Sequence, residues 1–233
     1  DSYLRTGQSD LALKTLEIQG TEAENSYELA EARAVILAEL GRLDEARTEY
    51  QKAQQIAVKQ GDRSSAVRAK VNLAGTYIDT QRASEAQAIM AEVQETSGLS
   101  RAVRDLTQLH RAELAELNKD PNRALQLYEE LTQAQSPDQH DPDLYRKCYH
   151  LARAIGDETL AQKLFKRSEE EALLILSKGE VFSLESLARL YLEAGTNLEQ
   201  AEKYALRNLE VKQDRSARET LNQVRQRLSA RLH

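Results

Sequence analysis

The chain has 233 residues, of which 40% are hydrophobic and 30% charged, and its formal net charge is −6 at pH 7. This negative charge disfavours a global attraction to nucleic acid or to an anionic membrane. The apolar runs are also far shorter than the roughly 20 residues that a membrane-spanning helix needs. Strong helix formers dominate, and the runs of β-branched and aromatic residues that mark strands are missing. We therefore expect a soluble all-α protein with no nucleic-acid partner and no membrane insertion.

The start of the chain and its cysteine content bear on its origin. It opens with DSYLRTG, without a methionine, and its one methionine is Met90. We expect a fragment of a longer protein. The single cysteine, Cys148, excludes an internal disulfide and favours a reducing compartment. A cytoplasmic location is the expectation, and a periplasmic one is not excluded because a helical array needs no disulfide.

Helical periodicity and turn residues predict alternating helices along the chain. The expected helices span 9–18, 26–40, 43–60, 64–80, 83–96, 99–117, 121–134, 142–155, 157–178, 181–194, 197–212 and 215–231. Polar residues that suit an N-cap or a first helical turn stand near several of these starts, namely Asp44, Ser84, Asp120 and Asp157. The proline-containing stretch 133–143 is either a hinge between two halves or a longer loop between helices. We favour the loop.

One spacing recurs through these helices. In the stretch LAELGRLDEARTEYQKA, Gly41 is followed by Ala46 and then by Tyr50, five and four residues apart. The same order occurs at Gly7, Ala12 and Leu16; Gln81, Ala86 and Met90; Lys119, Ala124 and Tyr128; Gly156, Ala161 and Phe165; and, with one extra residue, Gly195 and Ala201. A glycine permits the left-handed end of a helix, and an alanine permits close helix packing. The chain therefore repeats one helical hairpin, whose exposed apolar surface requires neighbouring copies to stack.

These residues resemble the tetratricopeptide repeat family in a long-unit variant, similar to arrays of bacterial signalling and regulatory proteins. Tyr3, Tyr77 and Tyr191 match its first-helix tyrosine, and Ala34, Ala74 and Ala188 match its small first-helix residue. The chain lacks the family's tryptophan and a consistent proline between units. The resemblance implies an all-α, right-handed superhelix of about five to six hairpins with a C-terminal capping helix. The expected single domain, 1–233, has units near 1–20, 26–61, 64–97, 99–135, 142–178 and 181–212, and a cap at 215–231.

Signals for catalysis are weak. The sequence has no Gly-rich phosphate loop, no nucleophile elbow and no histidine pair at metal-binding spacing. Cys148 and His150 are two residues apart on a predicted helix, so they point to different faces and form no direct nucleophile–base pair. Cys148 shares a face with Tyr145 and Tyr149, which favours a core position. We expect no enzyme, no catalytic residue, no cofactor and no metal site.

Basic and amide side chains recur on one face of the first helices of several units. On the expected helix 142–155, Arg146, His150 and Arg153 are predicted to lie opposite the apolar face. This basic row consists of Arg68, Asn72, Arg104, Gln108, Arg111, Arg146, Lys147, His150, Arg153 and Arg189. In proteins that resemble this family, first helices line a concave groove that holds peptides, and such a row could bind carboxylates. The alternative, which is the commoner case, is that the row is simply a solvated polar face.

Three functions are compatible with this pattern. The leading hypothesis is a protein–protein interaction scaffold that binds a protein or peptide partner, of acidic character, in the groove. The second is a regulatory or sensor arm of a larger signalling protein or transcriptional regulator. The third is a helical accessory domain of an enzyme whose catalytic part lies elsewhere. Self-association through the ends of the array is a further expectation, since a truncated start would expose an unfinished apolar face.

Overall fold

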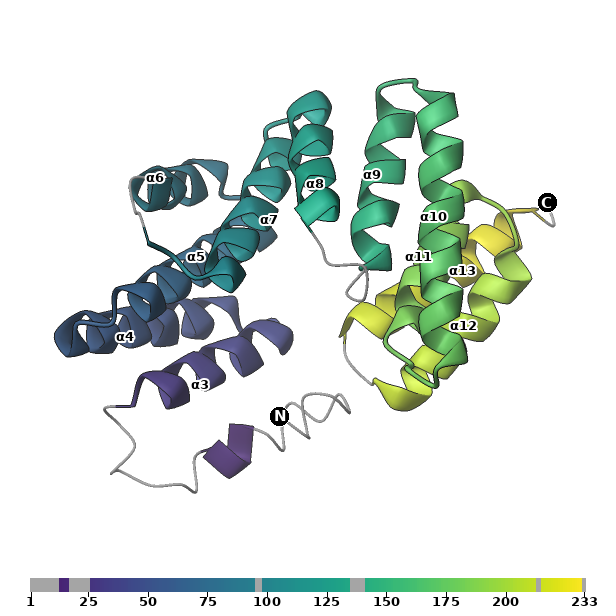
Figure 1. Ribbon diagram of the computed structural model, residues 1–233. Helices are drawn as coiled ribbons and strands as arrows, with labels where there is room; N and C mark the ends of the chain where they lie inside the picture. Colours follow the sequence, from purple (N-terminus) through teal and green to yellow (C-terminus); the bar gives the residue numbers. More distant parts are fainter. Residues whose placement is uncertain (1–12, 17–25, 95–97, 135–140, 213–214, 232–233) are drawn as a thin grey trace. The chain divides into compact units, whose positions relative to one another are not determined.

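The computed structural model describes residues 13–16, 26–94, 98–134, 141–212 and 215–231. Its helices (Figure 1) are α3 (Tyr27–Glu39), α4 (Leu43–Gln60), α5 (Arg63–Asp79), α6 (Ala83–Gln94), α7 (Arg101–Leu117), α8 (Pro121–Ala134), α9 (Pro142–Ala154), α10 (Glu158–Ser177), α11 (Ser183–Ala194), α12 (Leu198–Val211) and α13 (Arg215–Arg231). No strand occurs in the described part of the chain. The predicted all-α class is therefore confirmed.

The helix boundaries lie within about two residues of the predicted ones, and capping explains several of them. Ser100 accepts a hydrogen bond from the Val103 amide at 3.4 Å, so α7 begins at Arg101 and not at residue 99. Asp157 caps α10 in the same way through the Leu160 amide, at 2.9 Å. The predicted first unit, 1–20, lies outside the described residues except for a helical turn at 13–16.

The recurring spacing has a clear structural basis. Its turn residues all have positive φ: 75° at Gly41, 58° at Gln81, 60° at Lys119, 81° at Gly156 and 67° at Gly195. Each therefore has the left-handed conformation that ends a helix. The alanines that follow, Ala46, Ala86, Ala124, Ala161 and Ala201, are all buried. The predicted hairpin repeat is thus present from α3 to α12; Gly7 and Ala12 lie outside the described residues.

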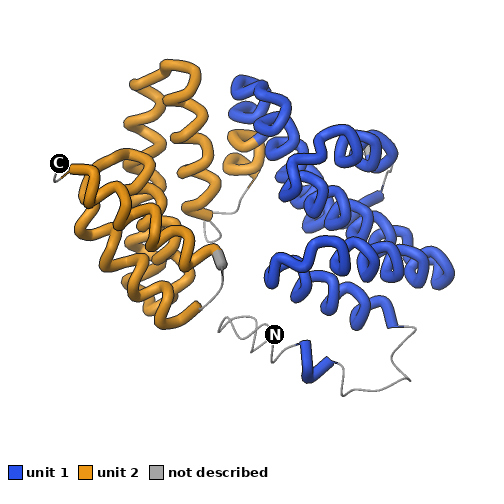
Figure 2. The backbone as a smooth tube through the Cα atoms, turned by 180° about the vertical axis from the view of Figure 1, so that it is seen from behind, with its two compact units in different colours: residues 1–4, 8–127 blue, residues 5–7, 128–233 orange. Residues whose placement is uncertain are grey.

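The described chain forms two compact units (Figure 2). The first ends at Leu127 and the second begins at Tyr128, so the division falls inside α8. It does not fall at the predicted connection 133–143, of which residues 135–140 lie outside the described part. We refer to these parts as the N-terminal unit and the C-terminal unit.

In the N-terminal unit, helices pack both within and between hairpins. Helix α4 lies between α3 and α5, and α6 packs on α5 and α7, while the first helices α3, α5 and α7 also touch in sequence order. Ala34, Tyr50 and Leu73 belong to one core cluster, and Met90 and Leu114 to the next. Each cluster draws on more than one hairpin, as stacking requires.

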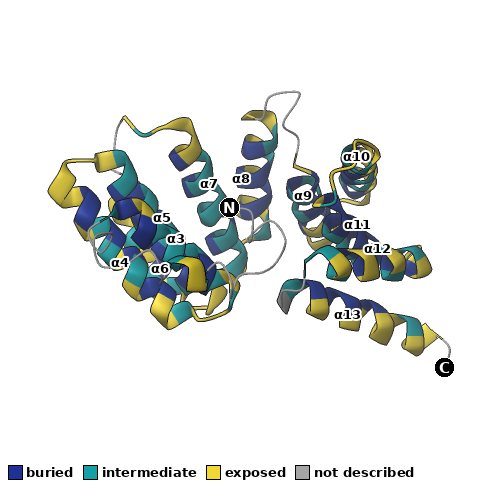
Figure 3. Cartoon of the chain, turned by 90° about the horizontal axis from the view of Figure 1, so that it is seen from below, coloured by how far each residue is buried: buried dark blue, intermediate teal, exposed yellow. Residues whose placement is uncertain are grey.

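In the C-terminal unit, aromatic rings run through the core. The ring centroids of Tyr149 and Phe165 are 5.6 Å apart, and Tyr191 lies 6.3 Å from Phe165 and 6.2 Å from Tyr204. Helix α13 packs on α11 and α12 with one face buried and the other exposed (Figure 3). This is the arrangement expected of the predicted capping helix.

Candidate functional site

Arg68, on α5, joins two first helices of the N-terminal unit. Its Nε donates a hydrogen bond of 3.0 Å to the Tyr27 hydroxyl on α3, and its guanidinium forms an ion pair with Glu31 of the same helix. The guanidinium also lies over the Tyr27 ring, 5.4 Å from the centroid. Burial and the hydrogen bond to Glu31 raise the pKa of Tyr27 to about 12. This member of the basic row therefore already has partners within the fold.

Arg146, on α9, is 8% exposed, although the sequence placed it opposite the apolar face. This placement is wrong, because the side chain enters a buried ion-pair cluster. Its Nε donates to Asp143 Oδ1 at 2.8 Å, and Nη1 contacts the Glu193 carboxylate on α11. Burial raises the pKa of Glu193, and the nearby Arg146 offsets this only in part. Burial also opposes ionisation of Asp143, but Arg146 outweighs it and holds the pKa of Asp143 below its ordinary value.

Arg153 and Lys147 make weaker contacts within the C-terminal unit. Arg153 Nη1 lies 3.3 Å from the Tyr149 hydroxyl and donates to the Glu193 carbonyl at 3.1 Å. Lys147 Nζ lies 3.4 Å from the Tyr128 hydroxyl, over that ring. Both side chains therefore help to hold neighbouring helices together.

Arg189 and His150 complete the row in this unit. Arg189, on α11, donates to Glu185 at 3.1 Å and to Ser216 of α13 at 2.7 Å, so it joins the cap to the array. His150 is exposed on α9.

The remaining members of the row lie in the N-terminal unit. Arg104 is exposed and donates to the Leu99 carbonyl at 2.5 Å, while Asn72 and Gln108 are half-buried. Arg111 is half-buried and forms no ion pair with any described residue. It lines a hollow, as Arg153 does in the C-terminal unit, but Arg153 also donates to a backbone carbonyl.

This arginine hollow has a volume of about 370 Å³ and lies between α6, α7 and the start of α8. The residues that define it are Met90, Ala91, Arg111, Leu114, Arg123 and Leu127. Met90, Leu114 and Leu127 are buried and provide an apolar floor. The hollow thus combines apolar surface with two guanidinium groups.

The charges of the arginine hollow are unbalanced. Arg123 Nη1 donates to Gln126 at 2.8 Å and, like Arg111, has no carboxylate partner among the described residues. Asp120 is the one acidic residue in the lining, and its carboxylate caps α8 by accepting from the Arg123 amide at 3.0 Å. Two cations therefore face the hollow with a single carboxylate, which is already engaged.

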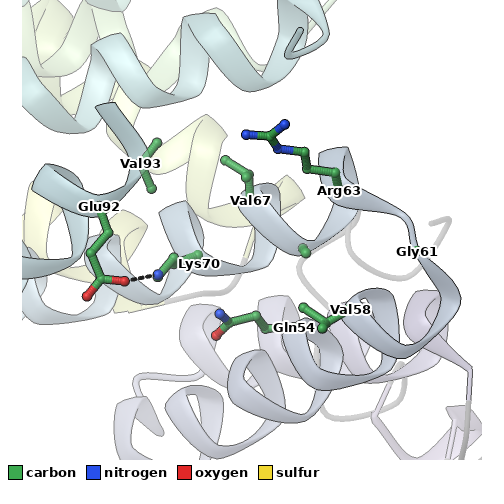
Figure 4. A pocket seen from close by; sticks show the side chains of 9 residues that line it. Gln54, Val58, Gly61, Arg63, Val67, Lys70, Glu92 and Val93 are labelled. Atoms are coloured by element: carbon green, nitrogen blue, oxygen red, sulfur yellow. Dashed lines mark hydrogen bonds and ion pairs between the residues drawn. The ribbon is translucent and has the colours of Figure 1, made fainter. Parts of the chain in front are cut away.

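A second hollow of about 290 Å³ lies between α4, α5 and α6 (Figure 4). This valine hollow is defined by Val58, Arg63, Val67, Lys70, Glu92 and Val93. Figure 4 shows the valine side chains coming from three helices, with the Lys70–Glu92 ion pair at one side.

The C-terminal unit has a hollow of about 340 Å³ beside its aromatic rings. It is defined by Tyr149, Arg153, Ala161, Phe165, Ala194 and Thr196. Its cation, Arg153, already donates to the Glu193 carbonyl. This hollow therefore offers fewer unused charges than the arginine hollow.

Neither Arg123 nor the valine hollow was predicted from the sequence. The basic row was sought on first helices, whereas Arg123 and Val58 lie on second helices. A signal existed at Val58, an apolar residue that follows the buried Ile56 and Ala57 but is itself exposed near the end of the helix.

The described residues also bear on metal sites and membrane spans. No group of three or more His, Cys, Asp or Glu side chains in those ranges is placed to hold a metal ion. No helix among them combines the length and the hydropathy that a membrane span requires.

Comparisons with known proteins give matches among solved structures but none among family models or curated proteins. A tetratricopeptide repeat protein from Parabacteroides merdae ATCC 43184 is similar in structure, with a TM-score of 0.47 and 15% sequence identity over 96% of this chain and 94% of that one. With a TM-score below 0.5 and 15% identity, this similarity by itself assigns neither a fold nor a function. The left-handed turns and buried alanines described above give the chain a tetratricopeptide-like helical-repeat fold.

Proposed function

We propose that this chain is a protein-interaction scaffold whose N-terminal unit binds an acidic segment of a partner protein. One observation carries the proposal: the arginine hollow presents Arg111 and Arg123, neither with a carboxylate partner among the described residues, around an apolar floor. A guanidinium binds a carboxylate through two parallel, charge-assisted hydrogen bonds. An acidic side chain next to an apolar one would therefore complement the hollow in both charge and hydrophobicity.

The charge of the whole chain sharpens this proposal. A net charge of −6 repels acidic partners in general, so a local pair of guanidinium groups would select where such a partner can dock. Arg104 and Gln108 lie on the same helix as Arg111 and could extend the contact. In contrast, Arg68, Arg146 and Arg189 would have to leave a carboxylate, a tyrosine or a serine before they could bind a partner. We therefore place the binding surface on α7 and α8.

The test uses a fluorescein-labelled peptide of alternating Glu and Leu, and the same peptide with Gln in place of Glu. We expect the Glu peptide to bind the full chain. The double substitution Arg111→Glu and Arg123→Glu should lower the affinity for this peptide about tenfold or more, as measured by fluorescence anisotropy. The matched control is Arg207→Glu with Arg218→Glu, which changes the charge equally on exposed residues of α12 and α13. Equal binding of the Glu and Gln peptides, or equal losses in both protein variants, would refute the proposal.

A further inference from the structure

Helix α6 separates the arginine hollow from the valine hollow. Gln87, Met90 and Ala91 line the arginine hollow, while Glu92 and Val93 line the valine hollow. With 3.6 residues per turn, these two sets lie on opposite flanks of the helix. Both hollows belong to the N-terminal unit, so a single bound segment could reach both.

The outer face of α6 between the hollows carries small side chains. Ala88 and Ala91 are exposed, whereas Ala86, Met90 and Val93 are buried on the inner side. Methyl groups add little height to a helix surface, so a peptide backbone can cross α6 there at close range. The ridge between the two hollows is therefore low.

The valine hollow provides an apolar anchor point. Val58 is 62% exposed at its edge, while Val67 and Val93 are buried beneath. A volume of about 290 Å³ is at the lower limit for small-molecule sites, which span about 300–1,000 Å³. The hollow thus suits one or two aliphatic side chains better than an extended ligand.

The rim of the valine hollow also favours an acidic partner. Arg63 is exposed there and forms no ion pair with a described residue, while Lys70 is paired with Glu92. The adjacent Asp62 caps α5 by accepting from the Ser65 amide at 3.0 Å. The rim therefore carries a positive charge, that of Arg63, without an ion-pair partner among the described residues, as the arginine hollow does.

We infer that the acidic partner segment of the proposed function crosses α6 and inserts an aliphatic side chain into the valine hollow. The inference rests on the proposed function and adds a second anchor, with defined chemistry, to the same segment. Charge complementarity identifies the occupant: an extended peptide with an aliphatic residue at one hollow and a carboxylate at the other.

The width of a helix sets the spacing between the two anchors. A helix with its side chains is about 10–12 Å across, and an extended peptide advances about 3.3–3.6 Å per residue. The aliphatic and acidic residues of the partner should therefore be three or four positions apart. A segment with adjacent Leu and Glu would reach only one hollow at a time.

The experiment combines peptide and protein changes in a double-mutant cycle. The probe is a labelled extended peptide with Leu and Glu four positions apart, compared with versions carrying Ala for Leu or a spacing of one. Val58→Gln replaces an exposed apolar side chain with a helix-compatible polar one, so folding should be retained. Leu206→Gln, at an exposed leucine of α12, is the matched control.

We expect Val58→Gln to lower the affinity for the Leu-containing peptide about fivefold to tenfold. The affinity for the version with Ala in place of Leu should not change. Shortening the spacing should cause a similar loss in the unmodified protein. Ala88→Gln places a longer side chain on the exposed face of α6 between the hollows. It should lower the affinity only for the peptide with the long spacing. If the losses of affinity from Val58→Gln and from Leu→Ala in the peptide are not additive, the peptide leucine contacts Val58.

Other outcomes separate the inference from the proposed function. Binding that depends on Arg111 and Arg123 but not on Val58 or the peptide Leu overturns the inference alone. Binding that depends on none of them overturns both. A dimer in analytical ultracentrifugation that Val58→Gln dissociates, with peptide affinity unchanged, also overturns the inference, because a second copy would then occupy the hollow.

Discussion

Helix α7 of the N-terminal unit and helix α9 of the C-terminal unit are both first helices, but Arg111 and Arg146 on them have different surroundings. In the C-terminal unit, Arg146 of α9 is buried against Asp143 and against Glu193 of the next first helix, α11. In the N-terminal unit, Arg111 of α7 has no carboxylate partner among the described residues and lines a hollow. The difference depends on whether a neighbouring helix presents an acidic side chain at the facing position. A basic stripe in a helical repeat can therefore either hold neighbouring hairpins together or form an exposed surface for a partner.

The joints between first helices differ accordingly. Between α5 and α7, the fit is steric: a Cβ added at Gly75 would lie 2.8 Å from His110 Cε1 and 2.9 Å from Nε2. The His110 ring is held in place by Glu113, 2.7 Å from Nδ1. Between α9 and α11, an ion pair supplies the contact. The steric joint leaves Arg111 of α7 without an ion pair among the described residues, whereas the ionic joint engages Arg146 of α9.

The largest expected effect breaks the ionic joint. Arg146→Met would leave the carboxylates of Asp143 and Glu193 without their cation, and should lower the free energy of unfolding by about 3 kcal/mol. Arg111→Met, the matched change in the other unit, should alter it by less than about 0.5 kcal/mol. Urea unfolding followed by circular dichroism measures both, and hydrogen exchange in α9 and α11 localises the loss. Equal effects of the two substitutions would contradict the comparison.

A smaller effect tests the steric joint. Alanine in place of Gly75 should gain about 0.5–1 kcal/mol from helix preference, but overpacking against His110 should cost about 1–3 kcal/mol. We expect a net loss of about 1 kcal/mol in the same unfolding measurement. Adding His110→Ala removes the clash, so Gly75→Ala should become stabilising in that background. If the substitution is equally harmful with and without His110, the joint is not steric.

The smallest effect is a pH dependence that separates the two carboxylates around Arg146. Asp143 has a lowered pKa when folded, so its contribution to stability is present above its ordinary value of 3.8 and is lost as pH falls through the lowered pKa. The destabilisation caused by Asp143→Asn should therefore shrink on acidification.

Glu193 should show the opposite trend. Its pKa is raised when folded, so protonation favours the folded state as pH falls through the raised pKa toward the ordinary 4.5. The wild type should therefore gain stability relative to Glu193→Gln over that interval. Urea unfolding of both variants between pH 7 and pH 3 measures the two trends, and parallel curves would show that the carboxylates have similar environments.

Much of the fold could be predicted because it depends on local pattern. Turn residues such as Gly41 and Lys119, with an alanine five positions later, locate each hairpin whatever lies on the outer surface. The candidate site was harder to predict from the sequence. Arg111 was identified, but Arg123 was not, and Arg146 was assigned to the wrong face of its helix. Helical periodicity locates a residue on its own helix and carries no information about the side chain that a neighbouring helix presents.

The sequence by itself therefore determined the repeated helical hairpin, the left-handed turns and the buried alanines, since these follow from backbone conformation and short-range packing. Only the tertiary structure decided which cations are used within the fold. Glu193 and Arg146 are 47 residues apart, and the packing of α11 on α9 brings their charges together. The packing of helices around Arg111 brings Arg123 to the same hollow, but the one carboxylate in the lining, Asp120, already caps α8. Such pairing depends on contacts between separate helices and not on the periodicity of either one.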